Sequence, residues 1–493
     1  MAQTYGNFIG GRWLAPDADE GFEDRSPSDL RVVLGRFPRS GAAEVDKAIQ
    51  AAERALPGWA RTPGPSRGRV LLRAHQIFTS RKAELAELMA REEGKIQREA
   101  LGEIQKGLNL LEYYAGEGLR MEGVTAPSEL PSNLLLTLRQ PLGVVAVITP
   151  WNFPFAIPIW KLAPALVTGN TVVMKPASAT PLMAVRIAEV FQEAGLPDGV
   201  LNLVFGGGGA VGDPLVDDPR VRAVSFTGSN AVGQRLATRA AGRLAKVTLE
   251  LGGKNAVVVM DDADLELAAA GVADGAFGST GQRCTATSRL LVHERVEPKV
   301  TELVAQAARS LRVGPSLDPE TTLGPVVDET QLEQNLAAVA TAIREGAEPV
   351  LEGRRVTEGE HAHGLFMTPA IFRRVDPGST LAQEEVFGPV LAVTTFSDLD
   401  EAVALTNRVR FGLTASIYTR NINRALRFVE DAQVGMVHIN SPTVGGEAAV
   451  PFGGVKASGA GFREMAKEGA LFFTEIKTVF IDYTGSRRSG NLY

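Results

Sequence analysis

The sequence predicts an α/β fold with parallel sheets, and two observations support this class. Short β-rich runs alternate with helix-like stretches in the first half of the chain, the runs being GVVAVIT (143–149), NTVVMK (170–175), GVLNLVF (199–205) and VRAVSF (221–226). A second alternating block begins at residue 252 and extends to GMVHIN at 435–440. Strands that are separated by helices indicate parallel βαβ units. The chain has 493 residues, and because one core rarely grows beyond about 300 residues we expect two or three domains.

The region before the first run, residues 42–117, is predicted to be mostly helical. Apolar residues recur there at spacings of three and four, in AAEVDKAIQAAERAL and in RVLLRAHQIFTSRKAELAELMAREEG. A later helix is predicted to begin at Thr180-Pro181, because threonine suits the N-cap and proline suits the first turn.

Residues 143–160 carry no charge and are about long enough to span a membrane. However, Pro150, Pro154 and Pro158 would break a spanning helix repeatedly, and a broken helix in lipid leaves polar backbone groups unpaired. We therefore expect a buried strand followed by a turn at this position.

The last fifty residues contain a predicted loop, a strand and a tail. SPTVGGEAAVPFGGVKASGAGF (441–462) is rich in glycine and proline, and loops of this kind often carry specificity. FFTEIKTVFIDY (472–483) is predicted to be a strand, and since no core remains for it to complete, we expect it to pair with another subunit. TGSRRSGNLY (484–493) is expected to be a solvated tail.

The composition favours a globular protein that binds neither nucleic acid nor membrane. Hydrophobic residues make up 44% and charged residues 22%, and the net charge is -6, which offers no electrostatic attraction for phosphate backbones or anionic lipid. The beginning of the chain, MAQTYGNFIGGRW, lacks the basic start and apolar run of a signal peptide. A single cysteine excludes an intramolecular disulfide and fits a reducing compartment, so we expect a cytoplasmic protein.

GQRCT (281–285) contains that single cysteine, Cys284. Taken alone, it could be an inert buried thiol, since free cysteine is commonly buried. Its small and polar neighbours do not resemble an apolar core strand, and Arg283 directly before it would favour the nucleophilic thiolate. Cys284 is therefore a candidate nucleophile.

The histidines do not suggest a catalytic dyad or a metal site. The chain has five, and none lies in a glycine-rich or acidic stretch. His361 and His363 in GEHAHG have no cysteine or acidic cluster near them, so a solvated loop is the better interpretation. No metal is expected.

Three stretches bear on nucleotide binding. GGGAVG (207–212) fits G-x-G-x-x-G but lacks the acidic residue that should follow about twenty positions later, so the signal is weak. FTGSNAVG (226–233) places Gly228 and Ser229 at a tight turn between a strand and a helix, which is a natural phosphate-binding corner. Glu250 ends the strand-like KVTLE, and strand ends are where α/β sheets bind ligands.

The order of these stretches resembles that of the aldehyde dehydrogenase superfamily, and the resemblance covers nearly the whole chain. Each motif is weak alone, but seven in order are specific. They are TPWNFP (149–154), KPAS (175–178), FTGS (226–229), LELGGKN (249–255), GQRC (281–284), EEVFGP (384–389) and PFGGVKASG (451–459).

The resemblance implies a three-part fold that assembles as a homo-oligomer, either a dimer or a tetramer. The parts are a Rossmann-type cofactor domain (1–127 and 147–250), an α/β catalytic domain (251–440), a substrate-loop region attached to it (441–471) and a small β oligomerisation element (128–146 and 472–493).

The resemblance also assigns the catalytic roles. Cys284 would attack the aldehyde carbon, and the side-chain amide of Asn152 with the Cys284 backbone N–H would stabilise the resulting oxyanion. Loss of hydride would leave a thioester, and Glu250 would act as the general base that activates Cys284 or the hydrolytic water. Neither a metal nor a histidine is required.

NADP or NAD is the implied cofactor. The implied contacts are Lys175 and Ser178 near the adenosine ribose, Gly228 and Ser229 near the pyrophosphate, and Trp151, Glu385 and Phe387 along the nicotinamide side. Ser178 stands where many NAD-preferring relatives carry glutamate. Serine does not repel a 2′-phosphate and leaves Lys175 free to pair with it, so we expect NADP to be accepted.

Arg283 is either a structurally paired side chain or a contact to an anionic substrate. A guanidinium beside the reacting carbon would bind a carboxylate bidentately. GQRCTATSR, SPTVGGE and TEIKTVFIDY are most similar to dehydrogenases of 2-oxoglutarate semialdehyde (2,5-dioxopentanoate).

Other substrates and one other class stay open. Succinate and glutarate semialdehydes are close in chemistry, and non-phosphorylating oxidation of glyceraldehyde 3-phosphate needs a similar cation. An aromatic aldehyde would suit an apolar tunnel lined by Phe153, Phe155 and Trp160. The different class is a catalytically idle homologue that serves as a structural or binding protein.

Overall fold

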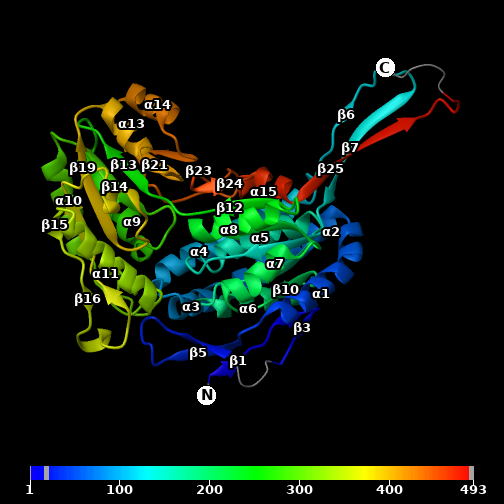
Figure 1. Cartoon of the computed structure of the whole chain (residues 1–493), viewed down its shortest axis with the longest axis horizontal. Helices are drawn as coiled ribbons and strands as arrows, with labels where there is room; N and C mark the ends of the chain where they lie inside the picture. The colour runs from blue at the N-terminus through cyan, green and yellow to red at the C-terminus, as the bar shows by residue number, and fades with distance from the viewer. Residues whose placement is uncertain (1, 16–20, 488–493) are drawn as a thin grey trace.

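The structure is a computed structural model that describes residues 2–15 and 21–487. Most of the chain forms two α/β units side by side, each built on a largely parallel sheet, and a narrow arm projects from one of them (Figure 1). This agrees with the predicted α/β class. Among residues 2–15 and 21–487, no helix is both long and apolar enough to cross a bilayer.

The first unit contains an eight-stranded sheet whose five central strands are parallel. In spatial order the strands are β24 (Gly459–Ala460), β12 (Lys246–Glu250), β11 (Val221–Thr227), β8 (Val144–Ile148), β9 (Thr171–Lys175), β10 (Leu201–Leu203), β2 (Phe8–Ile9) and β3 (Arg12–Trp13). The four predicted β-rich runs are β8, β9, β10 and β11. β8 and β9 are buried at every residue, as expected for parallel strands covered on both faces.

The strand order of this sheet reverses between β8 and β11, which are neighbours in space but far apart in sequence. In open α/β sheets, ligands bind outside the carboxyl ends of the strands at such a reversal. Here β8 ends just before the TPWNFP stretch and β11 ends at Thr227. The fold therefore predicts a ligand site between these two strand ends.

Helices cover both faces of the first sheet (Figure 1). They are α1 (Ala42–Arg61), α2 (Gly64–Ser80), α3 (Lys82–Glu92), α4 (Gln97–Glu117), α5 (Ala156–Val167), α6 (Pro181–Glu193), α7 (Asp213–Asp217) and α8 (Asn230–Ala241). The helical prediction for 42–117 is confirmed, and Thr180 precedes α6 as expected. The predicted turn after β8 is wrong beyond residue 155, because α5 begins there. Pro158 lies in its first turn, where a missing N–H leaves no intrahelical bond unmade.

The second unit contains a seven-stranded sheet with six parallel strands and one antiparallel edge strand. The order is β15 (Glu348–Leu351), β18 (Ala370–Arg373), β19 (Val390–Phe396), β14 (Thr287–His293), β13 (Asn255–Val259), β21 (Thr414–Tyr418) and β22 (Met436–Ile439). Its main helices are α9 (Leu265–Phe277), α10 (Glu297–Arg309), α11 (Glu329–Arg344), α13 (Leu399–Asn407) and α14 (Ile422–Asp431). Only four residues join β12 to β13, so the carboxyl end of β12 faces the amino end of β13.

The arm is a three-stranded antiparallel sheet that projects from the body (Figure 1). It consists of β6 (Thr125–Ala126), β7 (Asn133–Pro141) and β25 (Thr474–Asp482), and β25 pairs with β7 along its whole length. The C-terminal strand is thus paired within its own chain. The expected domain boundary at residue 146 falls inside β8, so residues 144–146 belong to the eight-stranded sheet. Residues 488–493 of the predicted arm and tail lie outside the described residues.

Candidate active site

Two cavities meet at Cys284. The first, of about 250 Å³, lies at the reversal point of the first sheet and is lined by Pro150, Trp151, Asn152, Thr227, Gly228, Ser229, Leu251, Gly252, Cys284, Gln331, Gln334, Glu385, Val386 and Phe387. The second, of about 300 Å³, is lined by Lys95, Glu99, Gly102, Glu103, Lys106, Phe153, Ile157, Trp160, Ser279, Arg283, Cys284, Thr285, Val444, Gly445 and Phe452. A group held at Cys284 can therefore reach both.

The loop that carries Cys284 has an unusual backbone. Ser279 and Thr280 have φ values of 50° and 55°, in the left-handed region that favours glycine. Gly281 follows with φ 66°, and a Cβ there would come within 2.2 Å of the Gly388 carbonyl oxygen. The glycine of GQRC is thus required both for the turn and for close contact with the segment after Phe387.

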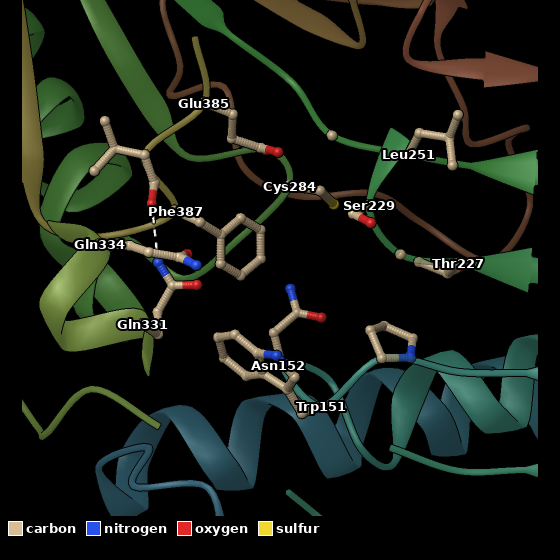
Figure 2. Close-up of a pocket in the computed structure, with 14 residues that line it drawn as sticks. Trp151, Asn152, Thr227, Ser229, Leu251, Cys284, Gln331, Gln334, Glu385 and Phe387 are labelled. Atoms are coloured by element: carbon tan, nitrogen blue, oxygen red, sulfur yellow. Dashed lines mark hydrogen bonds between the residues drawn. The ribbon is translucent and has the colours of Figure 1, made fainter. Parts of the chain in front are cut away.

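Hydrogen bonds from three directions hold this loop. Asn152 Nδ2 donates to the Gln282 carbonyl at 3.0 Å, and Asn255 Nδ2 donates to the Cys284 carbonyl at 2.8 Å. The Gln282 side-chain oxygen accepts from the Val327 backbone N–H at 3.0 Å. The nucleophile loop is therefore fixed to both units, and Asn152 lies against it. Figure 2 shows the Asn152 and Cys284 side chains entering one hollow, with Phe387 and Ser229 on either side.

The Cys284 thiol is protonated in this arrangement. Burial and, to a smaller extent, the nearby carboxylates of Glu385 and Glu250 raise its pKa to about 12, although Lys106 opposes this shift. The guanidinium of Arg283, which the sequence suggested as a group favouring the thiolate, is turned to other partners. Arg283 Nε donates to Ser279 Oγ at 3.0 Å, and Arg283 Nη2 lies 3.5 Å from Glu99 Oε1. A separate base must therefore take the thiol proton.

Glu250 ends β12 and is only 3% exposed. Burial raises the pKa of its carboxyl well above the usual range, and the nearby Glu464 raises it further. Its Oε2 accepts no hydrogen bond within the described parts of the chain. Lys161 opposes this shift; it forms an ion pair with Glu464 and donates to Ser225 Oγ at 3.0 Å. Glu250 thus has a free oxygen and a high affinity for a proton, as a general base near neutral pH requires.

The first cavity is bounded by aromatic rings and a fixed carboxylate. Trp151 and Phe387 meet edge to face, with ring centroids 5.3 Å apart. Glu385 Oε1 accepts from the Gly253 backbone N–H at 2.8 Å, and burial raises the pKa of this carboxyl to about 7. A Cβ on Gly252 would come within 2.1 Å of Glu385 Oε2, so glycine is needed where this carboxylate approaches the backbone.

Groups that suit a nucleotide lie at the neighbouring strand ends. Ser229 precedes α8, whose first N–H groups form a partially positive helix end beside the cavity. Lys175 ends β9; its Nζ donates to the Pro176 carbonyl at 2.9 Å, and burial lowers its pKa to about 8. Ser178 is exposed on the following turn, and its hydroxyl lies 3.4 Å from the Gly206 carbonyl. Within the part of the chain that the structure describes, the Lys175 ammonium has a carbonyl as its one acceptor.

The second cavity combines aromatic rings with charged side chains. Phe153, Trp160 and Phe452 form its apolar wall, whereas Phe155 is fully buried in the core and does not line it. Its charges come mainly from one face of α4, where Glu99, Glu103 and Lys106 recur at helical spacing.

The structure brings most of the predicted site residues to these two cavities. Trp151, Asn152, Gly228, Ser229, Glu385 and Phe387 line the first, Phe153, Trp160 and Arg283 line the second, and Cys284 lines both. Glu250 and Lys175 lie at the carboxyl ends of β12 and β9 in the first sheet, and Ser178 lies on the turn after β9. The sequence interpretation missed Lys95, Glu99, Glu103 and Lys106. Charges at three- and four-residue spacing normally indicate a solvated helix face, so their pattern did not mark them as site residues.

Known proteins resemble this chain in sequence and in fold. A sequence profile described as "Aldehyde dehydrogenase family" matches residues 13–479. The alpha-ketoglutaric semialdehyde dehydrogenase of Bacillus subtilis is 44% identical over 97% of this chain and 98% of its own length. The 2,5-dioxopentanoate dehydrogenase of Saccharolobus solfataricus is 42% identical over 95% and 98%. Among solved structures, an NADP-dependent enzyme of E. coli superposes with a TM-score of 0.93 at 38% identity, covering 97% of this chain and 98% of that one.

Proposed function

The chain belongs to the aldehyde dehydrogenase family, and from this we propose that it oxidises 2-oxoglutarate semialdehyde to 2-oxoglutarate with NADP or NAD. The observation that carries the proposal is the position of Cys284, where a cavity with cationic side chains meets a cavity suited to a nucleotide. The names of the relatives from Bacillus subtilis and Saccharolobus solfataricus point to the same substrate.

The reaction begins with attack of Cys284 Sγ on the aldehyde carbon, which forms a thiohemiacetal oxyanion. The Asn152 side-chain amide carries two hydrogens, and the Gln282 carbonyl takes one of them. The second hydrogen, together with the Cys284 backbone N–H, stabilises the oxyanion. Each such donor typically accelerates the reaction by about 10²–10³-fold.

Two proton transfers in this reaction need a base. The Cys284 thiol must lose its proton before or during attack, and water must lose one when it hydrolyses the acyl group on Cys284. Glu250 has the free oxygen and the raised proton affinity for both tasks. Hydrolysis returns Cys284 to the thiol and releases the carboxylic acid.

The first cavity fits a nicotinamide dinucleotide, because it joins a helix N-terminus, a glycine-lined backbone and a carboxylate held by Gly253. When bound, the dinucleotide supplies the hydride acceptor for the oxidation. Trp151 and Phe387 would enclose its nicotinamide half, and Gly228 and Ser229 would hold its pyrophosphate. Lys175 and Ser178 would face the adenosine ribose, where the cation suits a 2′-phosphate.

The second cavity would bind the rest of the aldehyde. Phe153 and Trp160 would pack against its methylene groups, and Arg283 lines the same space. Succinate and glutarate semialdehydes share the aldehyde and the terminal carboxylate and would be slower substrates. Arg283 already bonds to Ser279 and lies beside the Glu99 carboxylate, which neutralises part of its charge.

We also propose a cytoplasmic homo-oligomer, a dimer or a tetramer, assembled through the arm. Several large apolar side chains are exposed on β7 and β25, including Ile476 at 55% and Phe480 at 66%. A single protomer leaves this sheet uncovered on the exposed side, and a second copy would bury it.

A substrate panel with purified enzyme tests the proposal. The aldehydes are 2-oxoglutarate, succinate and glutarate semialdehydes, glyceraldehyde 3-phosphate and benzaldehyde, each with NADP and with NAD. The proposal requires the highest kcat/KM for 2-oxoglutarate semialdehyde. Highest activity with benzaldehyde or glyceraldehyde 3-phosphate would reject it, and no reduced cofactor with any aldehyde would support an idle homologue.

A further inference from the structure

The second cavity has one positive charge in excess. Three cationic and two carboxylate side chains line it: Lys95, Lys106, Arg283, Glu99 and Glu103. Lys95 Nζ lies 2.5 Å from Glu103 Oε2 and also donates to the Asn152 carbonyl at 2.8 Å. Lys95 is thus committed to fixing the segment around Asn152, and Glu103 in turn accepts from the first backbone N–H groups of α5.

Arg283 is also largely committed. Its guanidinium bonds to Ser279 and lies beside Glu99, whose Oε1 accepts from the Ser279 backbone N–H at 2.8 Å. A Cβ on Gly278 would come within 3.0 Å of an Arg283 nitrogen, so the guanidinium is packed against the backbone of the nucleophile loop. Through these contacts, Arg283 holds the nucleophile loop in place and neutralises the charge of Glu99.

Lys106 is the cation without a counter-charge. No hydrogen bond or ion pair joins its Nζ to any residue within 2–15 and 21–487. The ammonium lies 5.2 Å from the Trp160 ring centroid and 5.5 Å from that of Phe452, so two aromatic faces hold it where a carboxylate would be usual. The Trp160 indole N–H is likewise buried and donates to no described residue. Lys106 and Trp160 are therefore two donors for which no described residue supplies an acceptor.

The position of Lys106 fits a contact with an entering substrate. Lys106 also lines an outer hollow formed by α4 and the loop around residue 447, so it lies between the surface and the inner cavity. Its charge lowers the pKa of the Cys284 thiol, which requires the two groups to be near each other. An aldehyde bound at Cys284 with an anionic far end would bring that end to Lys106.

We propose that Lys106, more than Arg283, selects substrates with a carboxylate at the far end, by pairing with that carboxylate between the Trp160 and Phe452 rings. This inference rests on the proposed function, because it assigns a residue to the substrate of the same reaction. Arg283 then keeps the loop in place and cancels the charge of Glu99.

The test compares succinate semialdehyde with butanal, which has a methyl group in place of the carboxylate. For Lys106→Gln, we expect kcat/KM for succinate semialdehyde to fall by about 10- to 100-fold, the usual effect of losing a hydrogen bond to a charged group. The value for butanal should change by less than about threefold. Lys106→Arg should keep most of the selectivity, and Lys47→Gln, which removes an exposed lysine of α1, should leave it unchanged.

The double variant Glu99→Gln/Arg283→Gln distinguishes the role of Lys106 from that of Arg283. It removes one charge of each sign, so the net charge of the cavity stays the same. Selectivity within about threefold of the wild type supports Lys106 as the selecting residue. A loss as large as that of Lys106→Gln would assign the role to Arg283 and overturn the proposal.

Two further outcomes would also overturn it. If Lys106→Gln lowered kcat/KM equally for both aldehydes, Lys106 would act in ionising Cys284. If kcat/KM for both aldehydes stayed unchanged, Lys106 would have no role in substrate selection. Lys106→Met, whose apolar chain suits the slot between Trp160 and Phe452, is the second variant if Lys106→Gln melts below the assay temperature. A wild type that oxidises neither of these aldehydes nor 2-oxoglutarate semialdehyde would instead reject the proposed function, while one that oxidises butanal as well as succinate semialdehyde would reject only the selection for a carboxylate.

Discussion

Cofactor choice can be tested at Ser178, which is exposed on the turn after β9, close to Lys175 in sequence. Among the described residues, the buried Lys175 ammonium has the Pro176 carbonyl as its one acceptor, and burial lowers its pKa to about 8. A 2′-phosphate on the adenosine ribose would supply a negative charge beside Lys175. Ser178→Glu would place a carboxylate there instead, which would pair with Lys175 and repel the phosphate.

The size of the effect follows from two contributions. Loss of one charge-assisted hydrogen bond costs about 1.5–3 kcal/mol. Repulsion between two unit charges about 4 Å apart adds about 1 kcal/mol in a watery setting, which suits an exposed side chain such as Ser178. Together they give about 2.5–4 kcal/mol, or a shift of roughly 60- to 700-fold in the ratio of kcat/KM for NADP to that for NAD.

The assay measures kcat/KM for both cofactors at saturating succinate semialdehyde. Ser178→Gln is the control, because it adds similar volume without charge, and its ratio should stay within about fivefold of the wild type. Lys175 also predicts a pH dependence: as the pH rises through about 8 the free enzyme loses this charge, so kcat/KM for NADP should fall relative to NAD. A wild type strongly selective for NAD, or an unchanged ratio in Ser178→Glu, would refute the reasoning.

Three further predictions concern the catalytic groups and the arm. Asn152→Ala should lower kcat by about 10²–10³-fold, because it removes an oxyanion donor; a loss below tenfold in steady-state assays would contradict that role. Glu250 has a raised pKa in the folded protein, so the fold takes up protons relative to the unfolded chain, and stability falls as pH rises above the ordinary glutamate pKa of 4.5. Glu250→Gln should therefore melt higher than wild type at pH 8 and similarly at pH 4, and calorimetry showing a lower melting temperature at pH 8 would argue against it. Phe480→Asp should reduce the assembly size measured by sedimentation, whereas an unchanged oligomer would exclude the exposed face of β25 from the interface.

The fold class and the nucleophile were predictable because their signals are local. Parallel strands buried on both faces read as continuous apolar runs, and β8 and β9 follow that rule. Cys284 was identifiable because it is the only cysteine and lies in a polar, glycine-containing segment. Glu250 was identifiable because it ends a strand, and only Leu251 separates it from two glycines.

The charge distribution of the site was not predictable, because it depends on which side chains from distant segments meet. Lys106 and Glu99 lie on α4 in a pattern typical of a solvated face, and only packing of α4 against the nucleophile loop turns that face inward. The same packing pairs the Arg283 guanidinium with the Glu99 carboxylate and so directs it to a partner other than the Cys284 thiol. The thiol pKa of about 12 likewise results from burial and from two carboxylates that come from other parts of the chain.

The central claim is that oxidation passes through an acyl group on Cys284 that Glu250 helps to hydrolyse. The most direct measurement mixes Glu250→Gln with succinate semialdehyde and NADP, follows the reduced cofactor by stopped flow, and then maps the covalent adduct by mass spectrometry. Because Glu250 also takes the thiol proton, the account predicts a slowed burst of up to one reduced cofactor per active site, followed by still slower turnover, with the acyl group on the peptide that contains Cys284. Because the chain has one cysteine, the assignment is unambiguous. Full steady turnover without an adduct, or an adduct on any other residue, would contradict the account.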